Sequence, residues 1–120
     1  MAQPTTVLWI RNSAAFGGVE TCMLGWLDHL DRERFRCPTA LFNNRGRRED
    51  AFRMPLTERG HEILDLPWWP GRQVFRAINR LVQLIDETGA QLLHTHDWRS
   101  DVLGYYAARK TGIPILSTVY

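Results

Sequence analysis

Apolar residues follow two alternating spacings along the chain. Short, nearly continuous apolar runs, such as residues 7–10 and 63–66, are typical of strands that are buried on both faces of a sheet. Between these runs, apolar residues recur every three or four positions, as they do on a helix with one buried face. The pattern predicts strands at 7–10, 35–42, 63–66, 92–94 and 113–120, separated by helices at 19–30, 49–59, 74–85 and 101–110.

Three glycines mark the ends of predicted helices. Gly60, Gly89 and Gly112 each follow a helical segment and precede an apolar strand run. Glycine often ends a helix because it adopts the left-handed conformation without a steric penalty. Repeated helix–glycine–strand units indicate a parallel sheet, and its crossovers should be right-handed. We therefore predict an α/β fold: a Rossmann-like three-layer αβα sandwich with a five-stranded parallel sheet in the order 3-2-1-4-5. The first two helices should cover one face and the last two the other.

The first predicted helix has an apolar stripe that leaves Glu20 on its polar side. The stripe includes Cys22, while Cys37 lies near the end of a predicted strand. No C-x-x-C motif and no cysteine–histidine pairing surrounds either residue. Both are therefore predicted to be buried, reduced thiols.

Composition and charge narrow the class of protein. A chain of 120 residues with 44% hydrophobic and 23% charged residues has the size and composition of one globular domain. A formal net charge of +2 is too small to indicate a nucleic-acid partner. There is no apolar run of the roughly 20 residues that span a bilayer, and no basic flank typical of a secretory signal. We expect a cytoplasmic domain, and since the sequence stops within a predicted strand, we expect it to belong to a longer protein.

Two loops carry side chains that could contact a membrane. Arg45, Arg47 and Arg48 crowd one loop and could attract phosphates or an anionic membrane surface, or could simply be solvated. The adjacent Trp68 and Trp69 follow the third predicted strand. They could stack on a sugar ring, dip into a membrane interface, or cover the edge of the sheet.

Gly17 and Gly18 follow the first predicted strand and lead into the first helix. In an open parallel sheet, ligands bind outside the carboxyl ends of the strands, near the point where the strand order reverses. Paired glycines there allow a bound group close to the backbone, and free amides at a helix start favour an anion such as a diphosphate. The alternative is a turn that only requires positive φ. The dinucleotide motif G-x-G-x-x-G is absent, which disfavours NAD and FAD.

A second candidate site lies just after the fourth predicted strand, at His94, His96 and Asp97. Alternation along a strand places His94 and His96 on the same side, with His96 nearer the carboxyl end. Three interpretations stay open: His96 lines a sugar or phosphate site, both histidines are structural, or they form part of a metal site that lacks further ligands at suitable spacing. Asp97 or Ser100 could cap the fourth helix. No arrangement for covalent catalysis or for a paired-carboxylate hydrolase is evident.

Several segments together resemble the start of family 4 glycosyltransferases, which have the GT-B fold. The likeness covers essentially the whole chain in the right order. It rests on the run Phe16-Gly17-Gly18-Val19-Glu20, on residues 30–35 after the first helix, and on residues 94–97, 104–109, 112–114 and 117–120.

The resemblance implies that residues 1–120 form the N-terminal, acceptor-side domain of an enzyme with two Rossmann-like domains. A second domain, absent from this sequence, would bind most of the nucleotide-sugar, which serves as co-substrate, and no other cofactor is implied. Gly17 and Gly18 would approach the donor diphosphate and the acceptor. Transfer in the family is metal-independent and retains the anomeric configuration. The acceptor could be a sugar or lipid-linked, with peripheral contact at the inner face of the membrane.

The resemblance also makes Tyr120 a candidate site residue. Many members of the family have a histidine next to the reacting sugar at the place where this sequence has Tyr120. A phenol can hydrogen-bond a sugar hydroxyl, but it does not supply the proton chemistry of an imidazole near neutral pH. The predicted substrate-binding residues are therefore Gly17, Gly18, His96, Asp97 and Tyr120, with His96 and Tyr120 as candidates for catalysis.

Two other functions fit parts of the sequence. A non-catalytic, flavodoxin-like binding or regulatory module would have this size, but response regulators place acidic residues after the first strand, where this chain has Arg11, Asn12 and Ser13. A metal-dependent phosphoesterase could use the two histidines. Such enzymes usually begin with Asp-x-His-x-His near the chain start, whereas here Leu92 holds the Asp position, late in the sequence.

Overall fold

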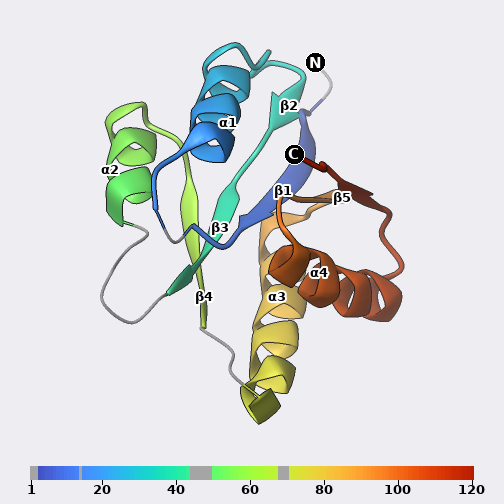
Figure 1. Ribbon diagram of the computed structural model, residues 1–120. Coiled ribbons are helices and arrows are strands. Elements are labelled where there is room, and N and C mark those ends of the chain that lie inside the picture. The colour runs from blue at the N-terminus through green and yellow to red at the C-terminus, as the bar shows by residue number, and fades with distance from the viewer. Residues whose placement is uncertain (1–2, 14, 44–49, 68–70) are drawn as a thin grey trace.

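The computed structural model describes residues 3–13, 15–43, 50–67 and 71–120, which form a parallel sheet between two pairs of helices (Figure 1). The arginines at 45, 47 and 48 and the tryptophans at 68 and 69 lie outside the described residues. The strands are β1 (Thr5–Arg11), β2 (Phe35–Arg36), β3 (Thr39–Asn43), β4 (Ile63–Pro67), β5 (Leu92–Thr95) and β6 (Ile115–Ser117). The helices are α1 (Gly18–Asp28), α2 (Asp50–Glu58), α3 (Val74–Thr88) and α4 (Trp98–Thr111), with a 3₁₀ turn, η1 (Gly71–Gln73), before α3.

The main path of the sheet has the order β4-β3-β1-β5-β6, and each of its pairs is parallel. This confirms the predicted 3-2-1-4-5 arrangement. The prediction of five strands was wrong by one, because the second predicted strand is divided into β2 and β3. Pro38 lies between them and has no N–H to donate to the sheet. The register continues across the break, since Thr6 pairs with Arg36 and Trp9 pairs with Thr39.

Alternate residues of β1 point to opposite faces of the sheet and divide the core in two. Val7 and Trp9 pack with α1 and α2, whereas Leu8 and Ile10 pack with α3 and α4. Figure 1 shows the same division, with α1 and α2 on one side of the sheet and α3 and α4 on the other. The predicted assignment of helices to faces is therefore confirmed.

The predicted helix ends are also confirmed. Gly60, Gly89 and Gly112 have φ values of 71°, 67° and 78°, in the left-handed region where a side chain is strained. In α3 and α4 the glycine is the C-cap residue. Among the described residues, no helix is long and apolar enough to cross a membrane.

Helix α1 corrects two predictions made from its apolar stripe. Its buried residues are Glu20, Met23, Leu24 and Leu27, whereas Cys22 is exposed. Glu20, which was placed on the polar side, instead turns inward and pairs with Arg11, so the buried face differs from the predicted stripe. Cys37 is half-buried, and this burial raises the pKa of its thiol to about 11, so it stays protonated near neutral pH.

Gly104 lets α4 pack closely on the sheet. A Cβ added there would lie 2.8 Å from both Thr95 Cγ2 and Ile115 Cδ1. The end of Ile115 can rotate, but Thr95 is buried and its hydroxyl donates to Asp101. Glycine is therefore required at this contact.

Replacement Gly104→Ala should lower the free energy of unfolding by about 1–3 kcal/mol, because the helix must shift away from β5. The matched control is Gly25→Ala in α1, where an added Cβ meets no atom within 4 Å. That variant should be as stable as the parent or up to about 1 kcal/mol more stable, since alanine favours helix. Urea unfolding measures both, and equal stability of the two variants would contradict this packing.

Candidate functional site

The loops that follow β1 and β5 start side by side. These strands are neighbours in the sheet, and Ile10 of β1 pairs with Thr95 of β5. One residue later, the backbone N–H of His96 donates to the carbonyl of Ile10 at 3.2 Å. The two loops singled out from the sequence therefore leave the same end of the sheet, at the carboxyl ends of parallel strands.

A buried ion pair connects these loops. Arg11 Nε donates to Glu20 Oε2 at 2.8 Å, and the two side chains are 14% and 2% exposed. Glu20 Oε1 accepts the backbone N–H of Gly17 at 3.0 Å, while Arg11 Nη1 donates to the carbonyl oxygen of His96 at 3.1 Å. A continuous hydrogen-bonded path thus runs from Gly17 through Glu20 and Arg11 to His96.

Asp97 forms a second connection. Its carboxylate caps α4 by accepting the N–H of Ser100 at 2.9 Å, which confirms one of the two predicted capping residues. It also accepts the Ser100 hydroxyl at 2.8 Å and the backbone N–H of Asn12 at 2.7 Å. Arg11 Nη1 lies 3.7 Å from the same carboxylate. Asp97 thus holds the start of α4 against the loop after β1, and its contact with a substrate stays a prediction.

Gly17 and Gly18 do not serve a turn with positive φ. Gly17 is the N-cap of α1, with φ of −150°, and Gly18 is the first residue of the helix. A Cβ added at Gly18 would meet no atom within 4 Å, and one at Gly17 would meet only the Glu20 carboxylate at 3.8 Å. Neither backbone conformation nor internal packing therefore requires glycine here. The small size leaves open space at the start of α1.

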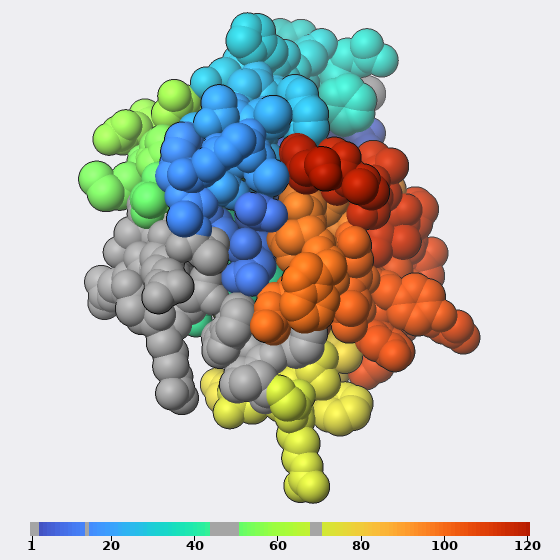
Figure 2. Space-filling view, viewed as in Figure 1, coloured from blue at the N-terminus to red at the C-terminus, as the bar shows by residue number. Residues whose placement is uncertain are grey.

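Aromatic side chains form a cluster beside the ion pair. The rings of His94 and His96 lie on the same side, as predicted, with centroids 4.0 Å apart, and His96 also packs on Trp9 at 4.6 Å. The Tyr120 hydroxyl is 2.8 Å from His96 Nδ1, and the Tyr120 ring stacks on Trp26 at 6.1 Å. Figure 2 shows the C-terminal segment, in red, against the blue surface of α1. The structure thus brings together both residues proposed for catalysis.

The imidazole of His96 is enclosed and neutral. His96 is 1% exposed, and its ring contacts the rings of Tyr120 and Trp26. Its buried Nε2 has no hydrogen-bond partner among the described residues. Burial, with smaller effects of the neighbouring His94 and Arg11, lowers the pKa of His96 to about 3. Burial also raises the pKa of Tyr120 to about 12, so the hydrogen bond joins two uncharged groups near neutral pH. Within the described ranges, no group of three or more potential metal ligands occurs.

Arg11, Glu20 and Trp26 belong to this site but were not selected from the sequence. Glu20 follows Gly17 by three residues, which is the spacing at which a side chain reaches back to the N-cap of a helix. Arg11 lies two residues after Trp9 and therefore projects from the same face of β1. These spacings could have predicted that each side chain faces the site. They could not have predicted that Arg11 and Glu20 form an ion pair with each other.

Solved structures share this fold with the chain. MurG from Acinetobacter baumannii superposes with a TM-score of 0.73 and 15% identity, covering 95% of this chain and 34% of that chain. Alr3699/HepE from Anabaena, solved with UDP and glucose, superposes with a TM-score of 0.67 and 21% identity, covering 91% of this chain and 28% of that chain. A glycosyltransferase from Rickettsia africae superposes with a TM-score of 0.62 and 16% identity, covering 99% of this chain and 31% of that chain. The chain therefore has the Rossmann-like fold found in GT-B glycosyltransferases and spans about a third of the length of these proteins.

The chain belongs to glycosyltransferase family 4, whose family model matches residues 16–120. This confirms the resemblance seen in the sequence, and the matched region includes the Gly17 and Gly18 loop, the loop after β5 and Tyr120. No curated protein sequence matches the chain.

Replacement Glu20→Gln should lower the free energy of unfolding by about 2–4 kcal/mol, because it leaves the buried Arg11 charge without its main partner. The control Glu62→Gln removes the partner of Arg36 in an ion pair whose side chains are 41% and 44% exposed. An exposed pair contributes only about 0–1 kcal/mol. Denaturant unfolding compares the two variants, and a Glu20 variant that loses no more stability than the control would refute the role of the buried pair.

Stability should also fall as the pH is lowered from about 6.5 toward 5, because histidine in the unfolded chain binds a proton in this range. His96 in the folded chain stays neutral down to a pKa of about 3, so the unfolded state binds more protons and is favoured. One such histidine contributes at most about 1.4 kcal/mol per pH unit. Unfolding measured at several pH values should give a smaller slope for His96→Phe, and an unchanged slope would count against a buried, neutral His96.

Proposed function

We propose that residues 1–120 are the N-terminal, acceptor-side half of a glycosyltransferase that moves a sugar from a nucleotide-sugar to an acceptor, with retention of configuration and without a metal ion. The observation that carries the proposal is the path from Gly17 through Glu20 and Arg11 to His96. It fixes two loops at the carboxyl ends of neighbouring strands, where open α/β sheets bind ligands. Membership in family 4 supports sugar transfer as the chemistry.

The start of α1 would receive the diphosphate of the donor. The first amides of a helix have no partner within the helix and favour an anion. Gly17 and Gly18 leave space at this point, since no atom lies within 4 Å of a Cβ at Gly18. The Glu20 carboxylate lies at the start of α1 and accepts the Gly17 amide, so the phosphate would bind the amides that follow Gly17. The ion pair with Arg11 neutralises this carboxylate and would limit its repulsion of a phosphate.

Tyr120 would face the reacting sugar from the other side of the cleft. The residue is 51% exposed, and its hydroxyl lies 2.8 Å from His96 Nδ1. Because the pKa of His96 is about 3, its role would be to orient this hydroxyl rather than to exchange a proton near neutral pH. Asp97 would support the same loop and contribute to substrate binding.

The proposals for the second domain, the cofactor and the acceptor rest on the resemblance to glycosyltransferase family 4. A second domain would bind most of the nucleotide-sugar, which is the co-substrate, and no further cofactor is needed. The acceptor would be a sugar or a lipid-linked sugar, reached by a cytoplasmic enzyme with peripheral contact at the inner face of the membrane.

Replacement Gly18→Ala in the complete protein should lower the rate of sugar transfer at least about ten-fold, which corresponds to about 1.4 kcal/mol, because the methyl group would occupy space used by the diphosphate. The thermal stability should not fall, since the added Cβ meets no atom within 4 Å. Transfer is measured with a radiolabelled nucleotide-sugar, and the midpoint of thermal unfolding is measured in parallel.

The matched control is Gly25→Ala, which adds a methyl group to the same helix and should keep full activity. Residues 1–120 alone should neither bind the nucleotide-sugar tightly nor transfer sugar, and chelation of divalent ions should leave transfer by the complete protein unchanged. Full activity of the Gly18 variant, or turnover by the isolated chain, would overturn the proposed arrangement.

A further inference from the structure

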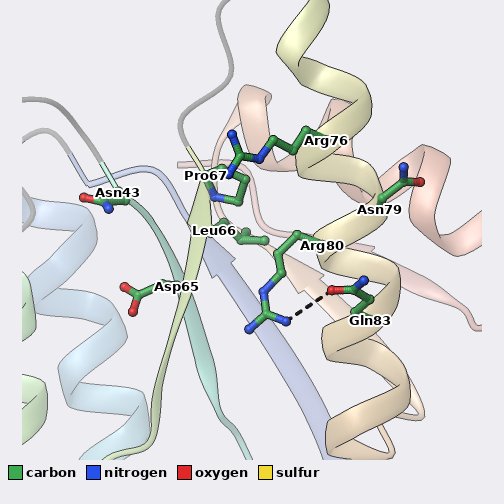
Figure 3. Close-up of a pocket in the computed structure, with 8 residues that line it drawn as sticks. All are labelled: Asn43, Asp65, Leu66, Pro67, Arg76, Asn79, Arg80 and Gln83. Carbon is green, nitrogen blue, oxygen red and sulfur yellow. Dashed lines mark hydrogen bonds between the residues drawn. The ribbon is translucent and has the colours of Figure 1, made fainter.

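A cavity of about 660 Å³ opens between β4 and the first turns of α3 (Figure 3). Its volume is within the range of about 300–1,000 Å³ that small-molecule sites occupy. Leu66 and Pro67 supply apolar wall, and the other lining side chains are polar or charged. None of the lining residues belongs to the loops at Gly17 and His96, so the cavity is a separate feature of the fold.

The charges around the cavity leave it positive. Asp65 contributes the carboxylate of the lining, and it is paired with Arg53 at 2.8 Å. Figure 3 shows Asp65 on the opposite side of β4 from Arg76 and Arg80. The two arginines of α3 are therefore not neutralised by the acidic residue of the lining.

Arg76 has no hydrogen bond or ion pair within the part of the chain that the structure describes. Arg80 has partners for one of its three guanidinium nitrogens: its Nη1 lies 3.3 Å from Gln83 Oε1 and 3.5 Å from Glu87 Oε1. Its Nε and Nη2 form no hydrogen bond with these two residues. Arg11, Arg36 and Arg59, in contrast, each have a carboxylate oxygen within 2.9 Å. The cavity thus contains guanidinium donors that the described chain does not satisfy.

The spacing of Arg76 and Arg80 fits a tetrahedral anion. Residues four apart lie one turn apart on the same face of a helix. Figure 3 shows both side chains extending from α3 toward β4, whereas Asn79 points away. Two guanidinium groups can each donate a pair of parallel N–H bonds, and this geometry matches phosphate oxygens.

We propose that the cavity between β4 and α3 binds the phosphate group of a phosphorylated ligand, with Arg76 as the main anion-binding residue and Arg80 beside it. The site does not depend on the proposed sugar transfer, because its residues and its ligand chemistry are its own. Phosphate could be presented by a soluble phosphate ester or by a lipid headgroup, and these two sources are distinguished by experiment.

The test uses titration calorimetry of the chain with inorganic phosphate and with glycerol phosphate. We expect saturable binding that Arg76→Gln weakens at least about ten-fold, the effect of losing a charge-assisted pair of hydrogen bonds. The matched control is Arg72→Gln. Arg72 is exposed and likewise has no partner among the described residues, but it does not line the cavity. The control should change affinity less than about two-fold, because only long-range charge is lost.

Vesicles of phosphatidylcholine, with and without phosphatidylglycerol, identify the source of the phosphate. Binding of glycerol phosphate without binding to anionic vesicles would support a soluble ligand. Co-sedimentation with anionic vesicles that is lost in Arg76→Gln but kept in Arg72→Gln would support a headgroup. Circular dichroism confirms that each variant is folded. Absence of saturable binding to every probe, or equal effects of the two substitutions, would overturn the proposal.

Discussion

The ion pair between Arg11 and Glu20 is the interaction on which the candidate site depends. A charge that leaves water must find a close partner and hydrogen bonds for its remaining donors or acceptors. Glu20 is 2% exposed and satisfies this requirement with Arg11 and the Gly17 amide, while Arg11 also reaches the carbonyl of His96. The requirement of one buried carboxylate thereby fixes the start of α1 relative to the loop after β5.

The charged groups and the aromatic groups of the candidate site have different structural roles. The ion pair and Asp97 set the backbone of the two loops, whereas Trp9 and His96 form a buried, uncharged layer behind the exposed Tyr120. In the proposed enzyme, amides at the start of α1 would meet the anion, and the exposed Tyr120 hydroxyl would meet the sugar. Membership in family 4 agrees with this chemistry, and the proposed second half of the enzyme would complete the cleft.

The sequence was sufficient for the strand order and the faces of the sheet, because residues such as Leu8 and Leu27 follow regular periods and Gly89 ends its helix through its own conformation. It was insufficient where one tertiary contact outweighed a local pattern. Glu20 was placed on the polar side of α1, since periodicity says nothing of a partner nine residues away. Cys22 was placed in the core for the same reason, and the single strand predicted at 35–42 did not allow for the missing N–H of Pro38.

We propose that Gly17 and Gly18, connected to His96 through the buried ion pair, form one wall of a sugar-transfer cleft. The most direct test is a crystal structure of the complete protein with a nucleotide-sugar bound. We expect a donor phosphate oxygen about 3 Å from the backbone N–H groups at the start of α1, with the Tyr120 hydroxyl at the sugar. A nucleotide-sugar bound at another edge of the sheet, with the Gly17 and Gly18 loop empty, would contradict it.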